Sequence, residues 1–113
     1  MIYFGFAVAD SMFPAQCVCQ RRPLTVEETK EILTNEEVKF CLNPSHRPTI
    51  EVARKMGLAI EIPESAPRVS LQPKDKVVVM SVRGLPRLEG RHEYTEEEIN
   101  QASFTFGLWE VLS

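Results

Sequence analysis

The segment Lys76–Val82 constrains the fold more than any other part of this chain, because its apolar residues fall on both sides of an extended backbone. A strand with no polar face must be covered on both faces by other parts of the protein. Strands of this kind lie inside sheets that are packed against helices. The segment therefore predicts a central strand in an α/β fold.

Local signals predict three helices around that strand. Thr25 is followed three residues later by Glu28, a capping box that predicts a helix over about 25–34. A second capping box, Thr95-Glu96-Glu97-Glu98, predicts a helix through about Ser103. Apolar residues at helical spacing over Thr49–Met56, closed by Gly57, predict the third.

Apolar runs between these helices predict the remaining strands. The run Ile2–Val8 predicts a first strand without polar alternation, and residues 14–23 read as a loop or a short edge segment. Pro73-Lys74-Asp75 is a turn, and Gly84–His92 is a loop. Further strands are predicted at Val38–Leu42, Leu58–Ile62, Arg68–Leu71 and Phe106–Leu112.

Taken together, these elements predict one compact domain over residues 1–113, with a mixed central sheet of about five strands flanked by helices. A chain of 113 residues matches the usual prior of roughly 100 to 200 residues per domain. No window reaches the roughly 18 consecutive apolar residues of a spanning helix, and the start lacks a secretory signal pattern. We therefore expect a cytoplasmic protein with no membrane partner.

Charge and cysteine content limit the partners and cofactors. The net charge of −3 disfavours a sequence-blind duplex binder, although it does not exclude duplex nucleic acid as a partner. Three cysteines are an odd number, which indicates reduced thiols rather than a disulfide framework. Cys17 and Cys19 could combine with Cys41, His46 or His92 to hold zinc, but they are separated by one residue rather than the usual two, and no second pair is present. Neither a metal nor another cofactor is therefore expected.

The turn Pro44–Thr49 carries the strongest candidate for chemistry. It places His46 and Arg47 before a predicted helix, whose free N–H groups and dipole attract an anion. Histidine can act as acid or base near neutral pH, and Arg68 and Arg87 could bind phosphate at the same sheet edge. The alternatives are a histidine that merely caps the turn and arginines that face solvent.

Several short motifs occur in a characteristic order along the chain. They are Ile2-Tyr3, Ser45-His46-Arg47-Pro48-Thr49, Pro67-Arg68-Val69, Lys74-Asp75-Lys76, Arg87-Leu88-Glu89-Gly90 and Phe106-Gly107-Leu108. In this order they resemble the YddF-like family of archaeal viruses, phages and bacteria. The resemblance implies a compact α/β homodimer, and viral members include type III anti-CRISPR ring nucleases. It thus implies a phosphodiesterase that cleaves cyclic tetra-adenylate without a metal or other cofactor.

The same resemblance implies roles for individual residues. His46 matches the family's catalytic histidine and would be the general acid, while Arg87 would stabilise charge on the phosphate. Glu89 would orient one of these two side chains, although the family's glutamate is one residue further along its motif. The ligand-binding residues implied are Arg68, Arg47, Thr49 and Ser11.

Three other functions also fit the sequence. One is a protein of the same fold that binds a cyclic oligonucleotide but is catalytically weak. A second is a nucleic-acid-binding regulatory protein, which would need a face that gathers Arg21, Arg22, Arg47, Arg83, Arg87 and Arg91. A third is a dimeric interaction module with no small-molecule site.

Overall fold

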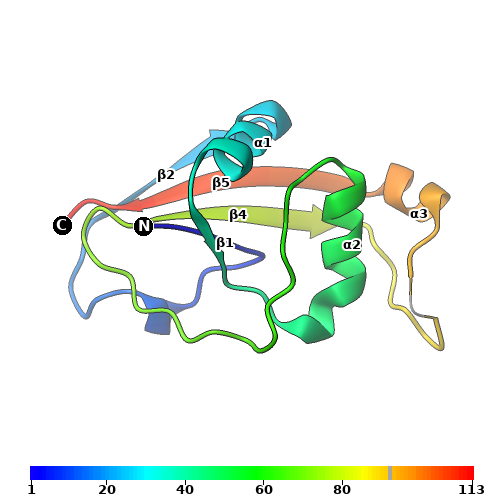
Figure 1. Ribbon diagram of the computed structural model, residues 1–113, viewed down its shortest axis with the longest axis horizontal. Helices are drawn as coiled ribbons and strands as arrows, with labels where there is room; N and C mark the ends of the chain where they lie inside the picture. The colour runs from blue at the N-terminus through cyan, green and yellow to red at the C-terminus, as the bar shows by residue number, and fades with distance from the viewer. Residues whose placement is uncertain (92) are drawn as a thin grey trace.

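The computed structural model describes residues 1–91 and 93–113 and is built on a five-stranded mixed sheet in the order β2-β5-β4-β1-β3. Strands β1 (Ile2–Gly5), β3 (Val38–Phe40) and β4 (Lys76–Arg83) are parallel. Strand β5 (Ser103–Val111) runs antiparallel to β4, and β2 (Cys19–Leu24) runs antiparallel to β5 (Figure 1). The predicted mixed α/β sheet is confirmed, with β4 at its centre.

Two helices cover one face of the sheet, which we call the helix face. Helices α1 (Val26–Asn35) and α2 (Arg47–Lys55) contribute Leu33 and Ile50 to a core cluster that also contains Phe4 and Val78 of the sheet. Helix α3 (Glu96–Gln101) lies beyond the end of the sheet that is far from both termini (Figure 1). Burial of these apolar side chains on one face is the main force holding α1 and α2 in place.

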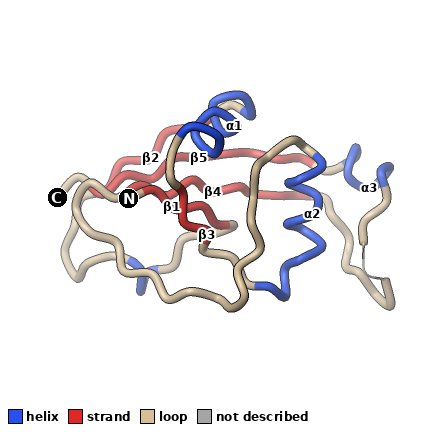
Figure 2. Tube along the Cα trace, viewed as in Figure 1, coloured by secondary structure: helices blue, strands red, loops and turns tan. Residues whose placement is uncertain are grey.

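Loops cover the opposite face, which we call the loop face. A second cluster of buried residues, Leu71, Val77, Val79 and Val111, packs there against side chains that precede β2 and β4. Figure 2 shows that these covering segments are irregular chain, apart from one turn of 3-10 helix at Asp10–Met12. The two-sided covering that the apolar strand Lys76–Val82 requires is thus provided by helices on one face and by loops on the other.

The capping boxes form as the sequence predicts. Thr25 Oγ1 accepts from the Glu28 N–H at 3.0 Å, and Glu28 Oε1 accepts from the Thr25 N–H at 3.0 Å. Thr95 and Glu98 make the same pair of bonds at 3.1 and 2.9 Å. Each box satisfies free N–H groups of a helix start, which fixes where α1 and α3 begin.

The strand predicted at Leu58–Ile62 is wrong. Leu58 and Ile60 are buried, but the Leu58 N–H donates to the carbonyl of Ala53 at 3.2 Å and the Ile60 N–H to that of Leu58 at 3.0 Å. The alternating burial comes from a loop that folds back on the end of α2. Alternation by itself does not provide the neighbouring backbone that a strand needs.

The strand predicted at Arg68–Leu71 is also wrong, for a similar reason. Leu71 is buried in the cluster on the loop face, and its N–H donates to the carbonyl of Met12 at 2.7 Å. The partner is therefore another loop, one that carries the short 3-10 turn, rather than a strand of the sheet.

Other boundaries differ by a few residues. Strand β1 ends at Gly5 rather than Val8, β3 at Phe40 rather than Leu42, and α3 before the predicted Ser103. Of the stretch 14–23, the edge interpretation holds from Cys19 onward, and β2 includes Pro23, which edge strands tolerate. Within the described residues, no helix is long and apolar enough to cross a lipid bilayer.

Candidate functional site

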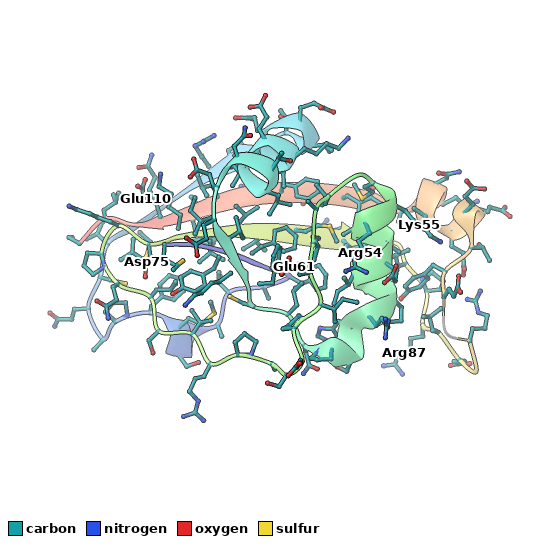
Figure 3. All side chains as sticks on the ribbon, in the orientation of Figure 1. Arg54, Lys55, Glu61, Asp75, Arg87 and Glu110 are labelled. Carbon is teal, nitrogen blue, oxygen red and sulfur yellow. The ribbon has the colours of Figure 1, made fainter. Side chains whose placement is uncertain are left out.

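The parallel strands direct two of the predicted site segments toward one end of the sheet. The chain leaves β3 toward His46 and β4 toward Arg87, whereas after β1 it turns back along the loop face, so that the turn Asp10–Met12 with Ser11 lies toward the end that holds the termini (Figure 2). These strands are neighbours, so their carboxyl ends lie together, and ligands of open α/β sheets bind outside such ends. In Figure 3 Arg87 lies at this end of the molecule, whereas Asp75 and Glu110 lie at the other. We call this end the carboxyl edge.

His46 is presented at the carboxyl edge by a short 3-10 turn, Pro44–His46, that leads directly into α2. Asn43 caps this turn, since its Oδ1 accepts from the Ser45 N–H at 2.9 Å. The exposed His46 side chain makes no capping hydrogen bond, and its ring centroid lies 6.3 Å from that of Phe6. The alternative in which His46 caps the turn is therefore wrong, and its side chain is open to another partner.

Arg68 and Ser11 line the same cavity, of about 640 Å³, between the segment after β1 and the loop before β4. Its walls also include Ala7 and Cys41, which follow the carboxyl ends of β1 and β3. We call it the Ser11 cavity. Among the described residues Arg68 forms no ion pair, so its guanidinium is available to an anionic ligand.

A second cavity, of about 420 Å³, lies on the other side of the segment 67–70 and shares Arg68 with the first. It is bounded by β1, by β3 and by the loop after α2, which supply Tyr3, Lys39 and Glu61. We call it the Glu61 cavity. These three residues could not be grouped from the sequence, because Glu61 lies in a segment that was predicted as a strand and forms a loop instead.

Arg47 lines a different hollow, of about 370 Å³, between α2 and the loop that precedes α3. Lys55, Glu93 and Tyr94 line it as well. None of the three cavities is lined by the predicted residues His46, Thr49, Arg87 and Glu89. The structure thus brings Arg68 and Ser11 together and leaves Arg47 apart from them.

The loop between β4 and α3 carries Arg87 and Glu89, both exposed. Within residues 1–91 and 93–113, no hydrogen bond or ion pair joins Glu89 to His46 or Arg87. The loop is fastened at its far end, where Arg91 donates to both carboxylate oxygens of Glu98 at 2.9 and 2.8 Å. The Arg91 guanidinium, followed by the Thr95 N–H, lowers the pKa of Glu98 to about 2.

The cysteines form one close pair and one separate thiol. Cys17 and Cys19 have their Sγ atoms 3.6 Å apart, whereas Cys41 lies in the wall between the two cavities that share Arg68. Burial raises the pKa of the Cys41 thiol to about 11, so it is protonated at neutral pH. The described residues contain no cluster of three metal-ligating side chains, and His92, a possible zinc ligand, lies outside them.

Two viral proteins of Sulfolobus hosts are similar to this chain. It is 31% identical over 97 residues to the protein described as Uncharacterized protein 26 of Sulfolobus islandicus filamentous virus (isolate Iceland/Hveragerdi), covering 85% of this chain and 78% of that protein. The solved structure of B116 of Sulfolobus turreted icosahedral virus has a TM-score of 0.70 at 13% identity, covering 96% of this chain and 97% of B116. The second likeness shows a shared fold. No family model matches the chain.

Proposed function

We propose a function for this protein from the premise that it belongs to the family of protein 26 of Sulfolobus islandicus filamentous virus, a family of archaeal-virus proteins. The proposed function is a ring nuclease that opens cyclic tetra-adenylate and so removes a second messenger of type III CRISPR defence. One observation carries the proposal. His46 and Arg87 follow the carboxyl ends of β3 and β4, the parallel strands on either side of β1, and ligands of such sheets bind at this end.

The proposed reaction is an internal transesterification. A ribose 2′-hydroxyl attacks the neighbouring phosphorus, so the O2′–P bond forms while the P–O5′ bond breaks. His46, as imidazolium, donates a proton to the departing 5′-oxygen, and water accepts the proton of the 2′-hydroxyl. The ring opens to a 2′,3′-cyclic phosphate and a free 5′-hydroxyl. General acid catalysis of this kind contributes roughly 10²- to 10⁴-fold.

The positive groups would hold and stabilise the phosphate. Arg68 and Ser11 share a cavity, so they suit the binding of one phosphate. Arg87 would approach the phosphate when the ligand is bound and stabilise charge in the transition state, with Glu89 as its orienting partner. Thr49 and Arg47 lie in the first turn of α2, whose N–H groups also favour an anion.

The proposal includes a homodimer in the host cytoplasm. A ring of four equivalent nucleotides has rotational symmetry, so a two-fold pair of subunits can present the same residues to opposite phosphates. The exposed position of His46 and Arg87 at the carboxyl edge leaves room for such a partner.

The test is to incubate the purified protein with cyclic tetra-adenylate in EDTA and to identify the products by liquid chromatography and mass spectrometry. We expect linear oligoadenylates that end in a 2′,3′-cyclic phosphate and begin with a 5′-hydroxyl. Recovery of the intact ring would contradict the enzymatic function.

One alternative has specific support. Among the described residues, Glu89 forms no hydrogen bond or ion pair with His46 or Arg87, and Arg87 does not line the cavities of Arg68. The protein could therefore bind the cyclic oligonucleotide without cleaving it efficiently. A binding protein would retain the ring tightly and return it unchanged. Calorimetric titration next to the cleavage assay separates the two functions.

A further inference from the structure

The Glu61 cavity combines apolar and charged lining residues in a volume that suits a small ligand. Its volume of about 420 Å³ lies within the range of small-molecule sites, roughly 300 to 1,000 Å³. Its polar lining residues are Tyr3, Lys39, Glu61 and Arg68. Its apolar lining residues are Val38, Phe40 and Ile62, which also pack against the core cluster on the helix face, together with Pro63, Pro67 and Val69.

The charges around this cavity are not neutralised within the described residues. Lys39, Glu61 and Arg68 all line it, and none of them forms an ion pair there. Two cations beside apolar walls suit a ligand that is anionic at one end and flat and apolar at the other. A nucleotide has this combination, and the edge of its base carries N–H donors from which a free carboxylate can accept a hydrogen bond.

Arg68 relates the two cavities to each other. It lines both the Ser11 cavity and the Glu61 cavity, so a phosphate held by Arg68 lies at the boundary between them. A nucleotide bound through that phosphate can extend its base into the smaller cavity, away from Ser11.

We infer that the Glu61 cavity binds the adenine base of a nucleotide whose phosphate meets Arg68, and that the Glu61 carboxylate accepts a hydrogen bond from the exocyclic amine of that base. Adenine as the base rests on the proposed function. Glu61 then sets base specificity, because a purine without the amine offers the carboxylate no donor at that position.

The experiment compares AMP with purine riboside 5′-monophosphate, whose base differs from adenine only by a hydrogen in place of the 6-amino group. Dissociation constants are measured by calorimetry for the wild type, for Glu61→Ala and for Glu64→Ala. Glu64 is an exposed carboxylate of the same loop that does not line the cavity, so its variant controls for the loss of one negative charge. Both variants are surface changes that leave the core intact.

We expect the wild type and Glu64→Ala to bind AMP roughly tenfold more tightly than purine riboside 5′-monophosphate, as a hydrogen bond to a charged acceptor predicts. In Glu61→Ala the two affinities should become equal. Equal affinities in the wild type, or an unchanged preference in Glu61→Ala, would overturn the inference.

These outcomes are separable from the proposed function. Cleavage of cyclic tetra-adenylate without any AMP preference overturns the base site and leaves the nuclease standing. An AMP preference that depends on Glu61, found together with an uncleaved ring, supports the base site and contradicts the nuclease.

Discussion

At the scale of single residues, Phe4 connects the core to the candidate site. Its ring is fully buried, and it packs edge-on against Phe6 and Phe40 with centroids 6.1 and 6.2 Å away. Phe6 in turn lies against His46. The position of the proposed general acid thus depends on aromatic packing that begins in the middle of the sheet.

Replacement of Phe4 by alanine should lower the free energy of unfolding by about 3–5 kcal/mol, because it removes buried surface and leaves a cavity. Urea denaturation measures this loss. Val18, 57% exposed, is the contrasting site, and Val18→Ala should stay within about 0.5 kcal/mol of the wild type. A loss under about 1 kcal/mol for Phe4→Ala would show that the core is not centred on this ring.

At the scale of elements, the Arg91–Glu98 ion pair fastens the loop that carries Arg87 to the start of α3. The pKa of Glu98 is lowered from 4.5 to about 2 in the folded protein. A lowered carboxyl pKa stabilises the fold above the unfolded value and loses that contribution as the pH falls. The stabilisation should therefore be complete above pH 4.5 and disappear between pH 4.5 and 2.

The variant Glu98→Gln makes this dependence measurable by thermal denaturation. Its melting temperature should lie below that of the wild type by a constant amount above pH 4.5, and the gap should close toward pH 2. Glu96→Gln is the control, since Glu96 is in the same helical turn and forms no ion pair within the described residues. A gap of equal size at both ends of the pH range would rule out the ion pair as its source.

The end of α2 provides a second prediction for an element. Gly57 has a φ of +94°, a left-handed conformation that suits the residue after a helix and that L side chains rarely adopt. A Cβ there would also lie 3.1 Å from Cε of Lys30. Gly57→Ala should lower the free energy of unfolding by roughly 1–2 kcal/mol in urea denaturation, and an unchanged value would contradict this conformation.

Elements with local signals could be predicted from the sequence, whereas those that depend on tertiary contacts could not. The capping boxes at Thr25 and Thr95 satisfy their own helix starts, so neighbouring residues specify them. The alternation around Leu58 and Ile60 predicted a strand, yet their N–H groups bond within the turn after α2. Burial of alternate residues is shared by strands and by loops that fold onto a core.

The same division holds for the candidate site. The sequence predicted His46 from its place before a helix, Arg68 as a phosphate-binding arginine at the same sheet edge, and Ser11 from a family resemblance. It could not predict Lys39 and Glu61 together, because they meet only when the loop after α2 closes beside β3. That Arg87 and Glu89 act together with His46 on the bound phosphate stays a prediction, which the functional assays test.

At the scale of the whole molecule, the proposed function predicts a two-fold assembly around the cyclic ligand. Sedimentation equilibrium at micromolar concentration should give twice the mass of one chain, because a symmetric ligand is best met by two copies of the same residues. A single-chain mass both with and without cyclic tetra-adenylate would contradict a shared site. The cleavage model would then need all catalytic groups from one subunit.

The most direct test of the central claim is the single-turnover rate of cyclic tetra-adenylate cleavage by His46→Ala beside the wild type. His46 is exposed, so its replacement should preserve the fold and ligand binding. We predict a rate lower by roughly 10²- to 10⁴-fold, as the loss of a general acid requires. A rate within about twofold of the wild type would contradict the assignment of His46 as the acid at the carboxyl edge.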